Sequence, residues 1–549
     1  MKKKLVAGIM AGMVVCQILT GCSKTENETI DDAYRTTYEI FVRSFYDSNG
    51  DGIGDLQGVI DKLDYINDGN PQTDDDLGCT QIWLMPICPS PTYHKYDVTD
   101  YCDVDPEYGT VEDYKKLIEE AHKRGIRVIN DTVMNHSSSQ HPWFKEAVGY
   151  LQKLPEGAEP KADECPYFDY YNFTKEPQKG YEQVAGTDWY YECQFWSEMP
   201  DLNLDNEKVQ KEFADMAKFW LDLGCDGFRM DAVTYYTSEN IGESTRELET
   251  FVKAVKDMNP DAYIVGEAWT SSESYSKYYA SGIDSLFDFD FSGSEGIIAK
   301  CAKGKASPDK YVQKQIEEDE LFSSYNKNYV NAPFYTNHDM ARSAGYYTGK
   351  KARDSIKLSG ALNLLMSGNA FIYYGEELGM KGSGKDENKR APMQWDAEGS
   401  KGMTKGPEGM DELKMSYGTY EEQKADPQSI YNYYKKAIKI RNQFPAISHG
   451  KCKILDNLTG ERNVVWIKDA EEKLNENTDR TGKVKNAKVL VALNNGDEPV
   501  TIDLSKDEGA KEFKKLAASL TTGEEEAALN GDKLTLPAFG IAVLTSDKK

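Results

Sequence analysis

Basic residues are fewer than acidic ones in this chain of 549 residues. Lysine and arginine number 65 against 92 aspartates and glutamates, which leaves a formal net charge of −27. A surface of that sign repels nucleic acid and anionic lipid headgroups, whereas a neutral polymer suffers no such penalty. We therefore expect no nucleic-acid partner and no membrane contact through the folded surface.

Long hydrophobic runs are also missing, apart from one short run at the N-terminus. Residues 1–4 are basic, residues 5–19 are apolar, and Leu19-Thr20-Gly21-Cys22 follows. An apolar segment of about 15 residues is too short to span a bilayer comfortably, and its basic start is typical of a secretory signal. We expect a removable signal at residues 1–21 and a polar tether at residues 22–35.

The four residues that end the apolar run resemble the bacterial lipoprotein box, in which removal of the signal leaves the cysteine as the lipid-modified first residue. That resemblance implies a lipidated Cys22 and a protein outside the cell or at the cell surface, anchored to the bacterial membrane through this lipid only. An ordinary secretory signal with an incidental cysteine is the alternative.

Cysteine pairs of the metal-binding type are absent. The chain has ten cysteines but no Cys-x-x-Cys spacing, which argues against a zinc site. Cys165 and Cys193 flank one aromatic segment, so a disulfide and two free thiols are both consistent with the sequence.

From about residue 36, short apolar runs of strand type alternate with amphipathic helical segments. Thr110 and Asp113 have capping-box spacing, and Gly125 ends the helical pattern that follows. Eight such runs predict an α/β fold, a (β/α)8 barrel, with a doubly wound open sheet as the alternative. The runs are residues 38–45, 80–87, 126–133, 227–233, 263–268, 285–291, 331–336 and 370–374.

The domain plan follows from where this alternation stops. We expect the barrel at residues 36–136 and 205–446, interrupted after its third strand by an aromatic-rich insert at residues 137–204. Beyond residue 446, short β-type runs separated by Gly, Asn and charged turns predict a β-sandwich at residues 447–549.

Three of the strand-type runs end on a carboxylate, namely Asp231, Glu267 and Asp339. In a (β/α)8 barrel the carboxyl ends of the strands form the active site. Cleavage of a glycosidic bond needs one carboxylate to attack or stabilise an oxocarbenium-like centre and one protonated carboxyl to supply the leaving oxygen. Asp231 and Glu267 fit these roles. Asp131 ends another run, but an aspartate there also caps helices, so its role stays open.

Four motifs in a fixed order identify the chain as a member of the α-amylase family, glycoside hydrolase family 13. The resemblance runs from about residue 38 to the C-terminus and implies that the insert is the family's domain B and the sandwich its domain C. The motifs are Asp131-Thr132-Val133-Met134-Asn135-His136, Gly227-Phe228-Arg229-Met230-Asp231-Ala232, Gly266-Glu267-Ala268-Trp269 and Thr336-Asn337-His338-Asp339.

By this resemblance Asp231 is the nucleophile and Glu267 is the acid that then becomes the base, with net retention at the anomeric carbon. Asp339 is the third catalytic carboxylate and binds sugar hydroxyls. Arg229 lies two residues before Asp231, on the same side of the strand, and can hold the nucleophile ionised. The substrate-binding residues implied in the same way are Tyr96, His136, Arg229 and His338.

Residues 47–55 offer hard oxygen ligands at alternate positions, which suits calcium. An EF-hand is disfavoured because Gly58 stands where its bidentate glutamate would be needed. The loop resembles the metal loop after the first strand of the family's oligosaccharidases, which implies a structural calcium, with magnesium as the alternative ion. A solvated Asx-turn loop is the competing interpretation. The implied ligands are Asp47, Asn49, Asp51, the carbonyl of Ile53, and Asp55.

Bond specificity is indicated less directly. Ala232 after the nucleophile and Trp269 after the acid favour an α-amylase cleaving α-1,4 bonds of starch, maltodextrins or maltooligosaccharides. The metal loop and the motif at residues 199–203 resemble the subgroup intermediate between oligo-1,6-glucosidases and neopullulanases. Lys95 replaces the glycine common before Tyr96, which leaves access to the sugar subsite open.

Several other activities fit the same residues. An oligo-1,6-glucosidase, an α-glucosidase, a neopullulanase-like enzyme and a transglycosylase are the catalytic alternatives. A non-catalytic sugar-binding or transporter-associated homologue is the alternative from another class. We expect a monomer with an α-glucan or maltooligosaccharide as its substrate.

Overall fold

The computed structural model describes residues 32–155, 157–237, 240–397, 399–412, 414–476 and 484–546. The predicted signal at residues 1–21 and the lipidation site Cys22 lie outside this part of the chain. Within it, no helix combines the length and apolar character that a bilayer crossing requires.

Seven parallel strands form the central sheet, in the order β10-β1-β2-β3-β7-β8-β9. Most of their residues are buried, as expected for a parallel sheet covered by helices. The strands are β1 Thr36–Ile40, β2 Gln81–Leu84, β3 Arg127–Thr132, β7 Gly227–Met230, β8 Tyr263–Gly266, β9 Ser285–Leu286 and β10 Ala370–Tyr373.

The sheet closes through an eighth segment that is not a regular strand. Ala332 bridges to Phe287 beside β9, and Phe334 bridges to Phe371 in β10. We predicted a strand at 331–336, but Pro333 in its middle has no N–H to donate, so pairing is reduced to these two bridges. The predicted (β/α)8 barrel is confirmed, and the open sheet is wrong.

One predicted strand is much shorter than its apolar run suggested. Of residues 285–291 only two belong to β9. The carboxylate of Asp288 accepts a hydrogen bond from Tyr275 at 3.2 Å, and that of Asp290 accepts one from Ser272 at 2.6 Å. These side-chain hydrogen bonds connect the segment to the neighbouring helix α7 (Ser272–Tyr275), where a longer strand would have paired with its neighbours through the backbone.

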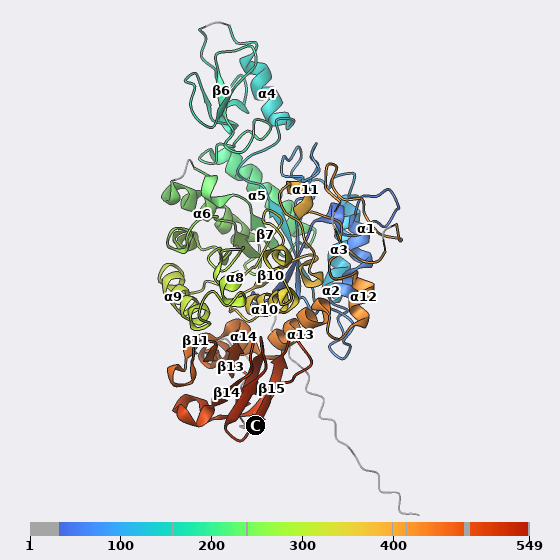
Figure 1. The fold of residues 1–549 in the computed structure, drawn as a ribbon. Helices are drawn as coiled ribbons and strands as arrows, with labels where there is room; N and C mark the ends of the chain where they lie inside the picture. Colours follow the sequence, from blue (N-terminus) through green and yellow to red (C-terminus); the bar gives the residue numbers. More distant parts are fainter. Residues whose placement is uncertain are drawn as a thin grey trace, which may run out of the picture. The chain divides into compact units, whose positions relative to one another are not determined.

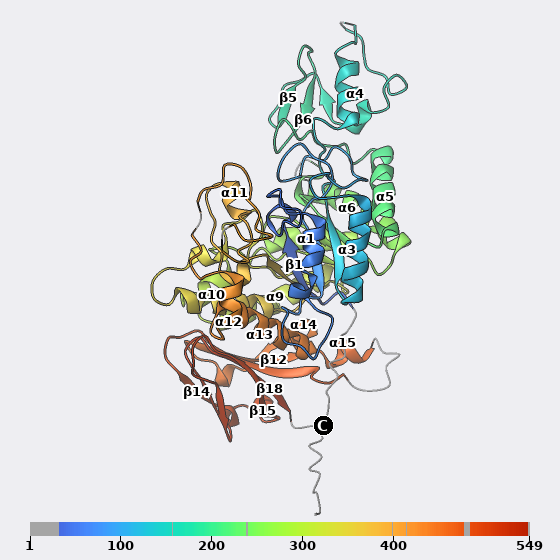
Figure 2. The ribbon, with the colours of Figure 1, turned by 90° about the vertical axis from the view of Figure 1, so that its right-hand side faces the viewer.

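Amphipathic helices cover the outside of the sheet (Figures 1 and 2). Helix α3 (Val111–Lys123) begins at the predicted capping box, where Thr110 and Asp113 exchange side-chain to backbone hydrogen bonds. Gly125 follows it in the left-handed conformation, with φ of 70°. The other helices are α1 Leu56–Asp61, α2 Leu63–Ile66, α4 Pro142–Leu151, α5 Glu207–Asp222, α6 Ile241–Met258, α7 Ser272–Tyr275, α8 Ile297–Ala302, α9 Asp309–Tyr325, α10 Ala352–Leu364, α11 Asp386–Lys389, α12 Tyr420–Ala425, α13 Ile430–Gln443, α14 Pro445–His449 and α15 Glu471–Glu476.

The insert after β3 carries its own small sheet and core. Leu151 of α4 packs with Val184 and Trp189 in a cluster separate from the barrel core. Cys165 and Cys193 are both free thiols, so the disulfide that the sequence allowed is not formed. The sheet has the order β4-β6-β5 and consists of β4 Phe173–Thr174, β5 Tyr181–Gln183 and β6 Tyr190–Glu192.

Two antiparallel sheets follow the barrel, with the orders β11-β12-β13-β18-β15 and β14-β17-β16. Val465 and Leu490 of the larger sheet share an apolar core with Leu534 of the smaller one. The predicted all-β C-terminal domain is confirmed. Its strands are β11 Lys451–Ile454, β12 Asn463–Asp469, β13 Lys488–Asn494, β14 Val500–Asp503, β15 Phe513–Leu520, β16 Ala528–Asn530, β17 Lys533–Leu536 and β18 Ile541–Ser546.

Candidate active site

The carboxylates predicted from the sequence lie at the carboxyl ends of the barrel strands. Asp231 directly follows β7 and Glu267 directly follows β8. Asp339 follows the bridging segment of Pro333, and Asp131 lies near the end of β3. Since parallel strands of a barrel end on one rim, these four acids lie at the same end of the barrel.

The side chain of Arg229 joins three of these acids. It is fully buried and projects from β7. Nη1 donates to Oδ1 of Asp231 at 2.6 Å and to the two carboxylate oxygens of Asp131 at 3.0 and 3.1 Å. Nη2 donates to Oε2 of Glu267 at 2.9 Å. Because one cation faces three carboxyl groups here, protonation among these carboxyl groups must offset part of the negative charge.

Glu267 is a buried acid whose pKa lies close to neutral pH. Burial raises the pKa of Glu267 to about 7, against the opposing effect of Arg229. Its Oε2 also accepts the N–H of Ala232 at 3.1 Å, from a backbone in the left-handed conformation with φ of 50°. A carboxyl that titrates near neutral pH can both donate a proton and take it back, as an acid/base catalyst must.

Asp131 belongs to this group, although the sequence left its role open. Its side chain is completely buried inside β3, so the helix-cap interpretation is wrong. Besides Arg229, its Oδ2 accepts hydrogen bonds from Trp83 Nε1 at 3.2 Å and from the Tyr96 hydroxyl at 3.1 Å. Burial raises the pKa of Asp131 to about 6. The signal in the sequence was its place at the head of the first motif.

His338 forms the centre of a second buried network. Nδ1 contacts Oε1 of Glu39 at 2.6 Å, and Nε2 contacts the Tyr96 hydroxyl at 2.7 Å and Oδ2 of Asp339 at 3.1 Å. Burial alone would lower the pKa of His338, but the two carboxylates raise it to about 9. His338 is therefore an imidazolium at neutral pH, and its ring is nearly parallel to that of Tyr96, at 16°.

Asp339 is held ionised by two basic groups. Burial by itself would raise its pKa, but His338 and Arg390 hold the pKa of Asp339 well below its usual range. Nη2 of Arg390 donates to Oδ1 of Asp339 at 2.9 Å. Arg390 comes from the segment between β10 and α12, where no motif marked it, so sequence reasoning missed this residue. The Asp339 side chain remains 34% exposed and is open to a ligand.

His136 has a ring nitrogen that is available to hydrogen bond to a ligand. Among the described residues nothing hydrogen bonds to its buried Nε2. Burial lowers the pKa of His136, so its ring is neutral and can bond a sugar hydroxyl. The ring of Phe195 lies 5.4 Å from it, and that of Tyr235 lies 4.7 Å from Phe195.

The predicted metal loop folds as a series of Asx turns. Oδ1 of Asp47 accepts the N–H of Asn49 at 3.1 Å, and Oδ1 of Asn49 accepts the N–H of Asp51 at 2.9 Å. Oδ1 of Asp51 accepts the N–H of Ile53 at 2.7 Å, and Asp55 caps helix α1. In the described part of the chain, no group of three or more His, Cys, Asp or Glu side chains is arranged to hold a metal ion.

The charges of this loop nevertheless fit a hard cation. Asp47 and Asp55 are only 4% and 5% exposed, and no basic side chain of the described residues forms an ion pair with either. Two buried carboxyl groups without an ion-pair partner in the described part of the chain, next to amide and carbonyl oxygens, are the donor chemistry that Ca²⁺ prefers.

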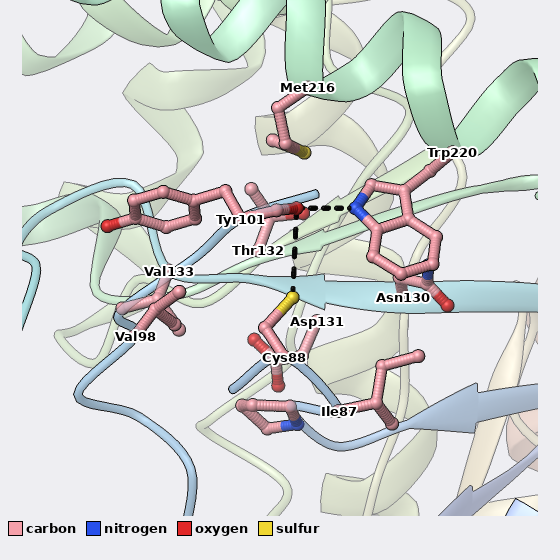
Figure 3. A pocket seen from close by; sticks show the side chains of 11 residues that line it. Ile87, Cys88, Val98, Tyr101, Asn130, Asp131, Thr132, Val133, Met216 and Trp220 are labelled. Atoms are coloured by element: carbon pink, nitrogen blue, oxygen red, sulfur yellow. Dashed lines mark hydrogen bonds between the residues drawn. The ribbon is translucent and has the colours of Figure 1, made fainter. Parts of the chain in front are cut away.

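A small cavity lies behind Asp131 (Figure 3). Its volume of about 10 Å³ gives room for about one water molecule. Figure 3 shows the carbonyl of Tyr101 accepting hydrogen bonds from Trp220 Nε1 at 2.9 Å and from Cys88 Sγ at 3.8 Å. Neither Asp231 nor Glu267 lines the cavity, which therefore belongs to the packing between β3 and α5.

Known proteins share this architecture over most of the chain. The family model of the alpha amylase catalytic domain matches residues 39–450. Alpha-amylase 3 of Dictyoglomus thermophilum is 39% identical over 452 residues, covering 78% of this chain and 81% of that protein. An oligo-1,6-glucosidase of Parageobacillus thermoglucosidasius is 31% identical over 497 residues, covering 75% and 84%. The solved structure of Eubacterium rectale Amy13B has a TM-score of 0.87 at 44% identity, covering 95% of this chain and 97% of that one.

A (β/α)8 barrel whose strands end in these carboxylates, with such relatives, is a glycoside hydrolase. The chain belongs to the α-amylase family, glycoside hydrolase family 13, as its four motifs predicted.

Replacing Arg229 tests whether its charge holds the acids together. We expect Arg229→Met to lower the free energy of unfolding at pH 7 by about 3–5 kcal/mol, because three buried carboxyl groups lose their cation. The loss should be smaller at pH 5, because Glu267 and Asp131, with pKa values of about 7 and 6, are then largely protonated and need no counterion. Chemical unfolding of the variant and the wild type at the two pH values measures both effects.

Arg353→Met serves as the matched control. Arg353 pairs with Asp426 at 2.8 Å, and both side chains are more than 40% exposed. This variant should lose less than about 1 kcal/mol. Equal losses for the two arginines would contradict the special role of Arg229.

Proposed function

We propose that this glycoside hydrolase is an α-amylase that cleaves α-1,4-glucosidic bonds of starch, maltodextrins or maltooligosaccharides with net retention. The observation that supports it most directly is the guanidinium of Arg229, which holds Asp231 on Nη1 and Glu267 on Nη2. Carboxyl groups on adjacent nitrogens of one guanidinium lie close together, and retaining glycosidases need a separation of about 5 Å, shorter than inverting ones.

The reaction takes two displacements. First, an oxygen of Asp231 attacks the anomeric carbon, the bond to the leaving oxygen breaks, and Glu267 gives that oxygen its proton. Water then attacks the same carbon, Glu267 takes a proton from the water, and the bond to Asp231 breaks. Each displacement inverts the configuration at the anomeric carbon, so the two displacements together retain it. Arg229 stabilises the negative charge that Asp231 needs in order to attack.

The remaining polar groups bind the sugar next to the nucleophile. We assign this role to His136, His338 and Asp339, because His136 Nε2 has no partner among the described residues and the Asp339 carboxylate is partly open. The ring of Tyr96 supplies an apolar face on which a sugar ring can stack.

Exposed aromatic rings support a substrate of several sugar units. Tyr235 lies four residues after Asp231 and is 38% exposed, and Trp269 lies two residues after Glu267 and is 51% exposed. Phe195, which contacts Tyr235, is 48% exposed. Large exposed rings beside a sugar-cleaving site are suited to stacking on further sugars of a glucan chain.

Two other assignments are weaker. An oligo-1,6-glucosidase, α-glucosidase or neopullulanase-like activity is favoured by the 31% identity to a protein named oligo-1,6-glucosidase. A non-catalytic sugar-binding or transporter-associated role is disfavoured, because Asp231, Glu267 and Asp339 are all present and paired with arginines.

The acid and the nucleophile can be tested by isosteric amides. We expect Glu267→Gln and Asp231→Asn each to slow release of reducing ends from soluble starch about 10³-fold or more. In the wild type, kcat/KM should fall above pH about 7, because ionised Glu267 cannot protonate the leaving oxygen. Glu249→Gln on the exposed face of α6 is the control and should keep full activity. Undiminished activity in either amide variant would refute the assignment.

A time course of products identifies which type of glucosidic bond is cleaved and at which position along the substrate. Early mixed maltooligosaccharides from soluble starch and maltotriose are the result that we expect. Glucose from isomaltose would instead indicate an oligo-1,6-glucosidase, and panose from pullulan a neopullulanase-like enzyme.

We propose that the loop of residues 47–55 binds a structural calcium ion, with magnesium as the alternative ion. Asp47, Asn49, Asp51, Asp55 and the carbonyl of Ile53 would hold it, and its charge would offset the buried carboxylates without entering the bond-cleaving step. Calcium at about 100 times its Kd should then stabilise the fold by about 2.7 kcal/mol.

Thermal unfolding with calcium and with EGTA tests this site. Calcium should raise the Tm of the wild type, and Asp51→Ala should abolish that rise. Asp61→Asn, on an exposed acid of helix α1 outside the loop, should keep it. A wild-type Tm that changes with neither calcium nor EGTA would show that the Asx turns alone stabilise the loop.

We further propose an extracellular or cell-surface monomer, attached to the bacterial membrane only by a lipid on Cys22. The basis is the sequence Leu19-Thr20-Gly21-Cys22 after a short apolar run. Expression in a bacterium fed labelled palmitate should label the wild type and not Cys22→Ala. Equal labelling of both would exclude the anchor.

A further inference from the structure

Lys95 combines a strained backbone with a buried charge. Its φ of 65° lies in the left-handed region, which is unfavourable for any residue with a side chain. The residue is also only 3% exposed. Non-glycine residues in this conformation persist where their surroundings fix them, and they gather at functional sites.

The side chain of Lys95 supplies that fixation. Nζ forms ion pairs with Oδ2 of Asp105 at 2.8 Å and with Oε2 of Glu107 at 2.7 Å. It also donates to the carbonyl of Ser90 at 3.4 Å. Nη1 of Arg43, in the 3-10 helix after β1, binds the same oxygen of Glu107 at 3.0 Å. The lysine is thus tied to its own loop and, through Glu107, to the chain after β1.

The next residue along the chain, Tyr96, belongs to the sugar-binding site proposed above, and the inference rests on that proposed function. The N–H of Tyr96 donates to Nδ1 of His94 at 3.1 Å. The hydroxyl of Tyr96 bridges the two charged networks of the site, because it bonds Asp131 at 3.1 Å and His338 at 2.7 Å. Lys95 and Tyr96 share one rigid peptide plane, so the backbone of the lysine sets the direction in which the tyrosine leaves the loop.

We propose that Lys95 is a positioning residue whose buried ion pairs with Asp105 and Glu107 hold Tyr96 in place between Asp131 and His338. A glycine would reach this backbone conformation without strain, but it would leave the loop free to adopt others. The lysine gives the loop one conformation and keeps its charge out of the space that the sugar occupies.

Lys95→Gly tests this effect, because glycine accepts the left-handed backbone without strain while the ion pairs that hold the loop in one conformation are lost. We expect kcat/KM on maltooligosaccharides to fall roughly 10- to 100-fold, mainly through KM, as the Tyr96 ring loses its fixed position. The six histidines allow ring-labelled NMR titration, in which the ring signals of His338 should shift from their wild-type positions, because the contact of its Nε2 with the Tyr96 hydroxyl at 2.7 Å loosens. Lys95→Arg keeps the charge and should recover most of both properties.

Two further variants separate positioning from a general loss of stability. If Lys95 acts through Tyr96, Lys95→Gly should add little to the defect of Tyr96→Ala. Lys357→Met removes another buried lysine, whose Nζ donates to the carbonyl of Thr522 at 2.9 Å, and should lower Tm without changing KM or the His338 ring signals. A wild-type KM and wild-type His338 ring signals in Lys95→Gly would overturn the proposal, and so would an equal fold-loss with and without Tyr96.

Discussion

The buried guanidinium of Arg229 is the interaction on which the rest of the site depends. Three acids that would repel one another lie within hydrogen-bond distance of a single cation. Withdrawing charges from water costs several kcal/mol for each ion, so the cluster holds together only where further donors contribute. Trp83 and Tyr96 supply them to Asp131, and the backbone of Ala232 supplies one to Glu267. Burial in this cluster raises the pKa of Glu267 to about 7, so that it can act as an acid and as a base beside Asp231.

In a second charged network, around His338, two basic side chains face two acidic ones. Here an imidazolium lies between Glu39 and Asp339, and Arg390 adds a further positive charge on Asp339. On the proposed mechanism, this network carries the polar atoms that bind a sugar, and the Arg229 network carries those that break the bond. The hydroxyl of Tyr96 touches both. The site can be understood as two electrostatic units, joined by one phenol whose position depends on the loop of Lys95.

The sequence predicted what is encoded locally. The strand runs, the capping box of α3 and the four motifs each lie within a few residues, and they placed the barrel and most of its site residues. Arg390 could not be predicted, because its pairing with Asp339 arises only when the segment after β10 folds back over the rim. Asp131 was ambiguous because the same residue type ends strands and caps helices. The metal loop was ambiguous for a similar reason, since Asx turns and calcium use the same oxygens. The irregular pairing of residues 331–336 could have been predicted from the sequence, because Pro333 lies in the middle of this apolar run.

Pro333 also leaves one irregularly paired place in the barrel, the segment of residues 331–336 between β9 and β10, which we call the seam. The seam is joined to each neighbour by a single bridge, whereas other neighbouring strands of the sheet pair through at least two residues. The seam leads directly into His338 and Asp339, whose side chains are held by ion pairs. Asp231 and Glu267 instead follow the paired strands β7 and β8. On the proposed mechanism, the residues that bind the sugar and those that break its bond are therefore held by different parts of the barrel. Substitutions near the seam can then change sugar binding without disturbing the strands that carry the nucleophile and the acid.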